Sequence, residues 1–390
     1  MIAGLDGLRA LAFLGVFSYH TGNLEYGWMG VQLFFVLSGF LITDILLRMK
    51  ESLPAKQFAA KFYGRRALRI LPVYYFYLFA LGAFIFIAPK INLGSLTQSL
   101  SNGFSHQVWY AIFYVYDFFR ASASGQETWH FGHIWSLSVE EQFYLVWPLL
   151  IFLTPKKYFQ RLCLAAICLG PVFRLITTLV FRSHMFPFLL DNPEEATYVL
   201  PFSHVDAFGL GAYISRFEIP RPRLQLLAAI ILVPAIGIFT DYWITGKVNI
   251  ANLGYSLPVA GAYKEVWGFT LLNYLFTLII YCVVKTRLLT QFLDLSPLRY
   301  LGKISYGLYV YHLFTIQAVT VAFKKFDLPF SLGSPVVYIV SLIVSILIAS
   351  LSYYFLEKPV LNLKTKYFRL SSDGSVSKTP ASSIPAPTDT

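Results

Sequence analysis

Three groups of ionisable side chains in this 390-residue sequence lie within or beside long apolar runs. The first group is Arg9 and His20, which are eleven residues apart. On an ideal α-helix eleven residues advance about 20° beyond three full turns, so both side chains project from nearly the same face, about 16 Å apart along the axis. Ionisable groups in an apolar helix face a polar cavity and mark functional sites by default. The alternative is a pair of anchors, one at each headgroup layer.

The second group is the run YGRRALRILP, residues 63–72, which holds Arg65, Arg66 and Arg69. Their spacings of three and four residues put the guanidinium groups on one flank of a helical turn. Arginine forks match the geometry of phosphate groups. Topology determination by contact with lipid headgroups explains the same residues equally well.

The third group lies in HFGHIWSLSVEEQFYLVWP, residues 130–148. Ser136 and Glu140 share a helix face, with His133 one turn before Ser136. Glu140 and Glu141 diverge by about 100°, so we expect at most one of them to point squarely into a given cavity. Carboxylates near a helix start can also simply oppose the helix dipole, although these two lie well inside the apolar run.

Five further polar residues give weaker signals, and a structural role is favoured for most of them. Asp6 precedes Arg9 by one turn and either anchors the helix start or orients Arg9. Glu357 is expected to cap the end of the last helix, and His204 and Asp206 to line the bundle as structural groups. His312 lies in the apolar run SYGLYVYH.

The elements that must position these groups are membrane helices. The sequence is 56% hydrophobic and 13% charged, whereas soluble domains are about 25% charged. Several apolar runs reach the roughly 20 residues that span a bilayer. We therefore predict an all-α polytopic membrane protein. About ten spans are predicted, at residues 5–22, 28–48, 68–88, 133–153, 159–181, 202–217, 223–242, 266–285, 303–323 and 333–357, with 107–119 lying at an interface or re-entering.

The distribution of basic residues predicts the orientation. Alternate connections carry 21 Lys and Arg on one side and 7 on the other. The positive-inside rule then puts both termini in the cytoplasm and the connections 89–132 and 240–265 outside. Residues 1–369 are expected to form the transmembrane domain. The Ser- and Pro-rich residues 370–390 are expected to form a disordered cytoplasmic tail.

Several classes of function are disfavoured. The net charge of +11 comes from connections that lie beside anionic lipid headgroups, so membrane lipids rather than nucleic acid are the expected partners. Cys163, Cys168 and Cys282 lie in apolar runs and are expected to be small core residues. No cleavable signal peptide is expected. The sequence lacks a P-loop, a nucleophile elbow and an HExxH pair, and no metal is expected.

The sequence resembles the acyltransferase-3 family of integral membrane acyltransferases, which are mostly bacterial and modify sugars and other exported acceptors. Gln32 departs from the commonest pattern, in which many members have an acid. The stretches that carry the resemblance are GLDGLRALA (4–12) with YH (19–20), GVQLFFVLSGFLIT (30–43), RRALRILPVYY (65–75), HIWSLSVEEQFYLVWP (133–148), GKISYGLYVYH (302–312) and LSYYFLEKP (351–359).

The resemblance implies ten spans, a cytoplasmic acyl-CoA (acetyl-CoA) donor and a hydroxyl acceptor on an exported or lipid-linked carbohydrate. It also implies a bacterial inner-membrane protein in the stand-alone form, without a fused hydrolase-like domain. The family's paired arginine and histidine match Arg9 and His20. Its R-x-x-R and S-x-x-x-E features match Arg66 with Arg69 and Ser136 with Glu140.

On this basis His20 is the expected general base, since imidazole titrates near neutral pH. Arg9 would contact the donor or stabilise developing negative charge, and Glu140 would orient His20 or position the acceptor. Arg65, Arg66 and Arg69 would bind the donor phosphates, with Ser136, His133 and Asp6 in support. Transfer is either direct or through an acyl-His20 intermediate.

Two other classes use the same residues. A proton-coupled transporter of a polar or lipid-linked solute would use the intramembrane His, Arg and Glu as a relay. A structural or sensory membrane component would need neither chemistry. The sequence carries no signal for the acceptor's identity, the acyl length or the oligomeric state.

Overall fold

A computed structural model describes residues 2–87, 95–123, 125, 128–189, 192–257 and 259–368. These residues are helical apart from turns and one isolated β-bridge between Ser122 and Leu189, which confirms the predicted all-α class. The longer helices are α1 (Leu5–His20), α2 (Gly30–Ser52), α3 (Ala55–Ile87), α4 (Ser95–Ile112), α6 (Ile134–Leu153), α7 (Phe159–Arg182), α9 (Val205–Arg216), α10 (Pro222–Thr245), α11 (Lys264–Thr286), α14 (Ser305–Lys325), α15 (Pro335–Ser352) and α16 (Lys358–Tyr367). The short elements are η1 (Gly27–Met29), α5 (Tyr116–Arg120), η3 (Lys156–Tyr158), α8 (Pro193–Val199), η4 (Pro201–His204), α12 (Thr290–Leu293), α13 (Ser296–Lys303) and the π-turn η5 (Tyr353–Glu357).

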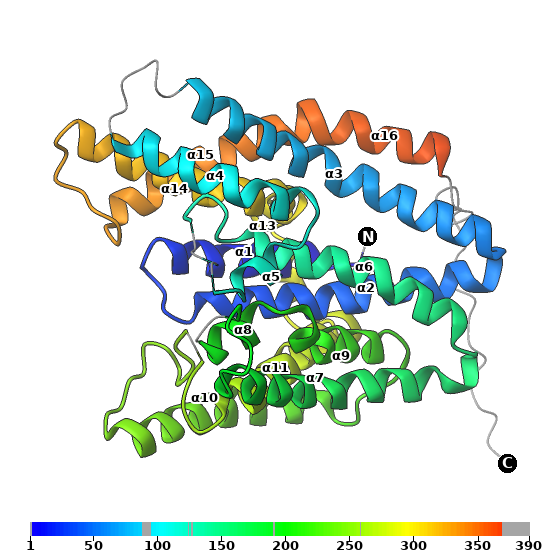
Figure 1. Cartoon of the computed structure of the whole chain (residues 1–390). Helices are drawn as coiled ribbons and strands as arrows, with labels where there is room; N and C mark the ends of the chain where they lie inside the picture. The colour runs from blue at the N-terminus through cyan, green and yellow to red at the C-terminus, as the bar shows by residue number, and fades with distance from the viewer. Residues whose placement is uncertain are drawn as a thin grey trace, which may run out of the picture.

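Helices α1, α2 and α6 occupy the middle of the bundle (Figure 1). On one side of them lie α3, α14, α15 and α16, and on the other α7, α9, α10 and α11. Helices α2 and α9 cross with their backbones almost in contact. A Cβ atom at Gly39 would lie 2.3 Å from the Phe208 carbonyl oxygen, and one at Gly211 would lie 2.1 Å from that of Val36. Small residues at such crossings let membrane helices pack closely.

Seven helical segments of the described residues are long and apolar enough to cross a membrane, so the chain is a helical integral membrane protein by length and composition. They are Gly27–Ser52, Ala55–Ile87, Ile134–Leu153, Lys156–Arg182, Pro222–Thr245, Lys264–Thr286 and Pro335–Lys364. Three predicted spans, α1, α9 and α14, are not among them. Helices α1 and α9 have only 16 and 12 residues, and most residues of α1, α9 and α14 are buried against other helices. A helix surrounded by protein needs no continuous apolar surface, and the count of ten stays a prediction.

The two ends of the described chain lie at the same end of the bundle. The start of α1 packs against α13, since a Cβ atom at Gly302 would lie 1.9 Å from the Asp6 carbonyl oxygen. Arg65 near the start of α3 donates a hydrogen bond of 2.9 Å to the Phe368 carbonyl just after α16. Figure 1 shows the start of α3 and the end of α16 at the right of the view, with α1 running leftward from the N-terminus right of centre. That this end faces the cytoplasm stays a prediction.

Some boundaries and environments differ from the sequence prediction. Helix α3 begins at Ala55 rather than residue 68, so the arginine cluster lies inside a 33-residue helix. The last helix continues through η5 into α16, so Glu357 is a buried internal residue, 2% exposed, and not a terminal cap. Hydropathy detects only the apolar part of a helix and misses its polar extension.

Three other expectations are placed as follows. Cys163 and Cys282 are buried as expected, but Cys168 is exposed because it lies on the outer face of α7. Residues 107–119 form the end of α4 and most of α5. The predicted tail, residues 370–390, lies outside the described residues.

Candidate active site

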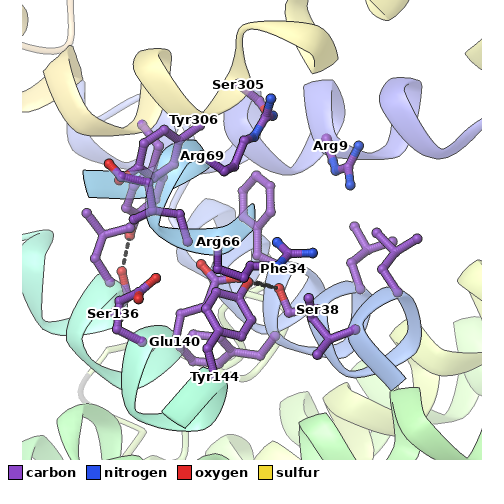
Figure 2. Close-up of a pocket in the computed structure, with 18 of the residues that line it drawn as sticks. Arg9, Phe34, Ser38, Arg66, Arg69, Ser136, Glu140, Tyr144, Ser305 and Tyr306 are labelled. Atoms are coloured by element: carbon purple, nitrogen blue, oxygen red, sulfur yellow. Dashed lines mark hydrogen bonds between the residues drawn. The ribbon is translucent and has the colours of Figure 1, made fainter. Parts of the chain in front are cut away.

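The first cavity, here called the arginine cavity, has a volume of about 220 Å³ and lies between α1, α2, α3, α6 and α14. Figure 2 shows Ser136 at one end, Arg9 at the opposite end, and Arg66 and Ser38 between them. The lining residues are Arg9, Val31, Phe34, Phe35, Leu37, Ser38, Leu41, Ile42, Ile45, Arg66, Arg69, Ile70, Ser136, Leu137, Glu140, Glu141, Tyr144, Ser305, Tyr306 and Tyr309.

Glu140 is fixed in this cavity by two hydroxyl groups. The Ser38 and Tyr144 hydroxyls both donate to its Oε1 atom, which connects α6 to α2 (Figure 2). The Arg66 guanidinium lies over the Tyr144 ring, 5.2 Å from its centroid, a geometry typical of a cation–π contact. Glu140 therefore helps to hold the Tyr144 ring against which the Arg66 guanidinium packs. Ser38 and Tyr144 were missed as candidates, although both lie in stretches that carry the family resemblance.

Both Glu140 and Glu141 line the arginine cavity. That at most one of the two side chains points squarely into it stays a prediction. The cavity extends around α6 from α2 to α3, and two faces about 100° apart can therefore both border it. The two carboxyl groups stand against three guanidinium groups in the same cavity.

The predicted arginines divide between the cavity and the bundle end. Arg66 and Arg69 line the cavity, whereas Arg65 is not a lining residue and donates to the Phe368 carbonyl instead. Arg9 lines the cavity and donates to the Asp6 carboxylate at 2.7 Å. Of the two roles considered for Asp6, this ion pair supports the orientation of Arg9.

The second cavity, here called the histidine cavity, has a volume of about 210 Å³. Two of its lining residues, His20 and His133, were predicted from the sequence. The full set is Tyr19, His20, Val31, Arg120, Gly132, His133, Trp135, Glu195, Tyr198, Leu257 and Tyr309. It therefore combines imidazole groups with aromatic rings and one pair of opposite charges.

A third imidazole, that of His312, lies behind this cavity. Its ring centroid is 5.1 Å from that of His20 and 5.2 Å from that of His133. His312 Nδ1 donates to the Tyr309 carbonyl at 2.6 Å, and His133 Nε2 donates to the Val310 carbonyl at 2.9 Å. Both rings are thus held in place by the backbone of α14. His312, which gave only a weak signal in the sequence, is part of this cluster of three imidazole groups.

His20 differs from its two neighbours. Among the described residues, the His20 ring nitrogens, like His133 Nδ1 and His312 Nε2, have no hydrogen-bond partner. The unpartnered nitrogens of His133 and His312 are fully buried, whereas those of His20 are not, so of these three imidazoles the one of His20 is the most accessible to a molecule in the histidine cavity, which it lines. Glu140 accepts from Ser38 and Tyr144, so the geometry gives no contact through which it would orient His20.

The charged pair of the histidine cavity comes from two short helices outside the predicted spans. Arg120 of α5 donates to the Glu195 carboxylate of α8, and the arginine side chain is only 7% exposed. Trp135 and Tyr198 lie beside this pair with ring centroids 4.5 Å apart. Arg120 and Glu195 were missed because they lie in separate connections of the sequence, with no spacing that links them.

The two cavities meet at a shared wall. Among the residues that line them, Val31 of α2 and Tyr309 of α14 belong to both. The Tyr309 hydroxyl lies 2.5 Å from the Ser136 Oγ atom, and Ser136 donates to the His133 carbonyl at 2.9 Å. Arg9 and His20, eleven residues apart on α1, thus border cavities on opposite sides of this wall.

Two other polar groups of the bundle have structural partners. Arg174 makes a two-pronged ion pair with Asp206, at 2.9 and 2.8 Å, in which both side chains are fully buried. His204 Nε2 donates to the Tyr198 carbonyl, and its Nδ1 accepts from the Gln32 amide at 3.3 Å. Gln32 therefore has a hydrogen-bond partner within the bundle. Both sets of contacts favour the structural role expected of His204 and Asp206.

The chain is similar both to individual proteins and to a family of protein domains. The chain is 27% identical over 371 residues to the O-acetyltransferase OatA of Staphylococcus aureus and 28% identical over 396 residues to YrhL of Bacillus subtilis, named as a candidate peptidoglycan O-acetyltransferase. Each alignment covers 94% of this chain but only 58% and 56% of the relative, so the chain spans little more than half the length of these proteins. No solved structure matches the chain significantly. The acyltransferase domain family matches residues 2–354, nearly the whole chain, and the protein therefore belongs to this acyltransferase family.

Proposed function

We propose that the protein transfers an acyl group, in the simplest case acetyl, from acyl-CoA in the arginine cavity to a hydroxyl of a carbohydrate in the histidine cavity. The observation that carries this proposal is that the two cavities are neighbours that share the lining residues Val31 and Tyr309. One cavity offers cations and the other offers an available imidazole. A group-transfer reaction between two substrates that approach from opposite sides needs this division.

The arginine cavity suits the donor. Coenzyme A carries phosphates at one end and a thioester at the end of a long, flexible arm. Arg9, Arg66 and Arg69 supply guanidinium groups that bind phosphate with charge-assisted hydrogen bonds. Along α2 the lining extends from Val31 to Ile45, which corresponds to about 21 Å at the helical rise. Such a long cavity can hold the arm with the thioester directed at the wall.

The position of Arg9 separates its two candidate roles. Arg9 lies at the opposite end of the cavity from Ser136, and Ser136 contacts the wall residue Tyr309 (Figure 2). A group so far from the wall is suited to the phosphate end of the donor rather than to charge that develops at the thioester. We therefore assign Arg9 to donor binding.

The histidine cavity suits a carbohydrate acceptor. Aromatic rings such as those of Trp135 and Tyr198 pack against the apolar faces of sugars, and charged groups such as Arg120 and Glu195 hydrogen-bond to sugar hydroxyls. The name of one relative points to peptidoglycan, a polymer with a sugar backbone. We extend this acceptor class, an exported or lipid-linked glycan, to the present chain.

In the proposed reaction His20 is the general base. Its free ring nitrogen removes the proton of the acceptor hydroxyl as the hydroxyl oxygen attacks the thioester carbonyl carbon. The carbon–sulfur bond breaks, an ester forms, and the coenzyme leaves as a thiol after gaining a proton. Attack by His20 itself, followed by transfer from acyl-His20, gives the same products. Mass spectrometry of protein quenched during turnover separates the two routes.

A donor from the cytoplasm and an acceptor outside are supported by the position of Arg9, which lines the arginine cavity and lies near the start of α1, at the end of the bundle to which the basic connections are assigned. A bacterial inner membrane is the compartment that supplies both substrates.

The test uses the full chain in lipid nanodiscs with acetyl-CoA and soluble peptidoglycan fragments. We expect free thiol to appear together with O-acetylated fragments, and thiol release to be slow without acceptor. Solute movement across proteoliposomes without any consumption of acyl-CoA would overturn the proposal in favour of a transporter.

A further inference from the structure

The wall between the two cavities is built by side chains that leave little space between them. Val31 is 5% exposed and Tyr309 is 7% exposed, although each borders a cavity on both sides. The Phe34 ring contacts the Tyr309 ring with its edge, at a centroid distance of 6.1 Å. On the arginine-cavity side the wall therefore consists of buried, mainly apolar side chains together with the bonded hydroxyl groups of Tyr309 and Ser136.

The Tyr309 side chain is held in one orientation by its neighbours. Since Ser136 donates its own proton to the His133 carbonyl, it accepts the hydrogen bond of the Tyr309 hydroxyl at 2.5 Å. The backbone carbonyl of Tyr309 accepts from His312 Nδ1 at 2.6 Å. The Tyr309 ring also packs against the rings of Phe34, His133 and His312, and these contacts together with the hydroxyl bond hold the side chain in place.

We propose that Val31 and Tyr309 select the length of the acyl group and restrict the donor to short acyl chains. The inference rests on the proposed function, in which the thioester must meet the His20 imidazole across this wall. An acetyl group ends one carbon after the carbonyl. Each further methylene would have to fit between the Val31 methyl groups and the Tyr309 ring, or fold back beside Phe34 and draw the carbonyl away from His20.

The size of the effect follows from the packing of the wall. One methylene in a closely fitting apolar pocket changes discrimination between substrates by about 10- to 200-fold. Replacing Val31 by Ala removes two methyl groups from the wall and leaves the charged lining of both cavities intact. Replacing it by Ile adds one methylene at the same place.

The experiment compares kcat/KM for acetyl-, propionyl-, butyryl- and hexanoyl-CoA with soluble peptidoglycan fragments, for the full chain in nanodiscs. We expect the wild-type protein to prefer acetyl-CoA, and Val31→Ala to raise the butyryl-to-acetyl ratio by about tenfold or more. Val31→Ile should lower the propionyl-to-acetyl ratio. Tyr309→Phe, which keeps the ring but loses the bond to Ser136, should raise the butyryl-to-acetyl ratio less than Val31→Ala does.

A matched control is Ile45→Ala, which shortens a lining side chain of α2 at the far end of the arginine cavity. It should leave the ratio between acyl groups unchanged. Unchanged ratios in both Val31 variants, or an equal change of the ratio in Ile45→Ala, would overturn the inference. Acetyl transfer by the wild type in the same experiment would still uphold the proposed function. If the wild type consumes none of the thioesters, the proposed function itself fails.

Discussion

The arginine cavity and the histidine cavity are similar in volume but are assembled differently. The charged side chains of the first all come from long helices, namely α1, α3 and α6. The charged side chains of the second, Arg120 and Glu195, come from the short helices α5 and α8. Helical spacing relates residues within one helix, so it reveals groups of the first kind and misses groups of the second.

The difference also concerns chemistry. The arginine cavity is lined by three guanidinium groups and is suited to an anionic ligand. The histidine cavity offers imidazole and aromatic groups, with its one arginine already paired with Glu195. If this comparison is right, changes in the two cavities should affect different kinetic constants, and the following predictions test that separation.

The largest expected effect is that of His20→Ala. Removing the general base should lower kcat by about 100-fold or more and leave the KM for acetyl-CoA unchanged, because the donor lies in the other cavity. The measurement is thiol release coupled to acceptor acylation in nanodiscs. His106→Ala, at an exposed position on α4, is the matched control and should retain wild-type turnover. Wild-type kcat in folded His20→Ala protein would contradict the assignment.

The next effect is that of Arg66→Ala and Arg69→Ala. Each change removes a charge-assisted hydrogen bond to phosphate, worth about 1.5–3 kcal/mol, so the KM for acetyl-CoA should rise roughly 10- to 100-fold. The acceptor KM should not change. Arg65→Ala is the control, since this arginine contacts the Phe368 carbonyl and does not line the cavity. If all three variants show the same donor dependence as wild type, the arginines act only in topology.

A smaller effect is expected from Glu195→Gln. This change keeps the side-chain shape but removes the charge that pairs with Arg120, and it should raise the acceptor KM roughly fivefold, for about 1 kcal/mol of lost interaction. The neighbouring Glu194→Gln is the control, because Glu194 pairs with Arg182 and does not line either cavity. A change in the donor KM instead would break the proposed separation of the two cavities.

The smallest effect concerns the stability of the short helix that carries Arg120. Asp117 of α5 is fully buried, and the Gln142 amide donates to its carboxyl group at 3.0 and 3.1 Å. Burial raises the pKa of Asp117 to about 7, although hydrogen bonds from Gln142 and from the backbone oppose the rise. The folded state holds this proton more tightly than the unfolded state, so the protonated carboxyl group contributes to the free energy of unfolding at low pH. That contribution is lost as the pH rises from about 4 to 7. Asp117→Asn should remove that dependence.

The measurement is the melting temperature in detergent of wild type and Asp117→Asn at pH 5 and pH 8. At each pH the melting temperature of the variant is compared with that of wild type. We expect this difference to favour the variant by a few degrees more at pH 8 than at pH 5. Asp44→Asn, at a partly exposed residue of an i,i+4 ion pair on α2, should show no such gain. An identical difference between variant and wild type at both pH values would contradict the raised pKa.

The predicted and observed ends of the helices differ mainly where a helix extends beyond its apolar part. The apolar runs predicted α2, α6, α7, α10 and α11 within a few residues of their observed ends. They missed the polar first turns of α3 and the continuation of the last helix beyond residue 357 into α16. Hydropathy responds to the surface that a helix presents to lipid, and these extensions present charged side chains instead.

The sequence by itself determined the class of the protein, the helices that carry the candidate site residues, and the residues within single helices that share a face: Arg9 with His20, Arg66 with Arg69, and Ser136 with Glu140. Spacing along one helix fixes such relations, because the rise and the turn per residue are constant. Only the tertiary structure decided that Arg9 and His20 border different cavities, that Glu140 bonds to Ser38, and that Arg120 meets Glu195. Those contacts join helices far apart in the chain, and they depend on how the helices pack, for which no local spacing gives a rule.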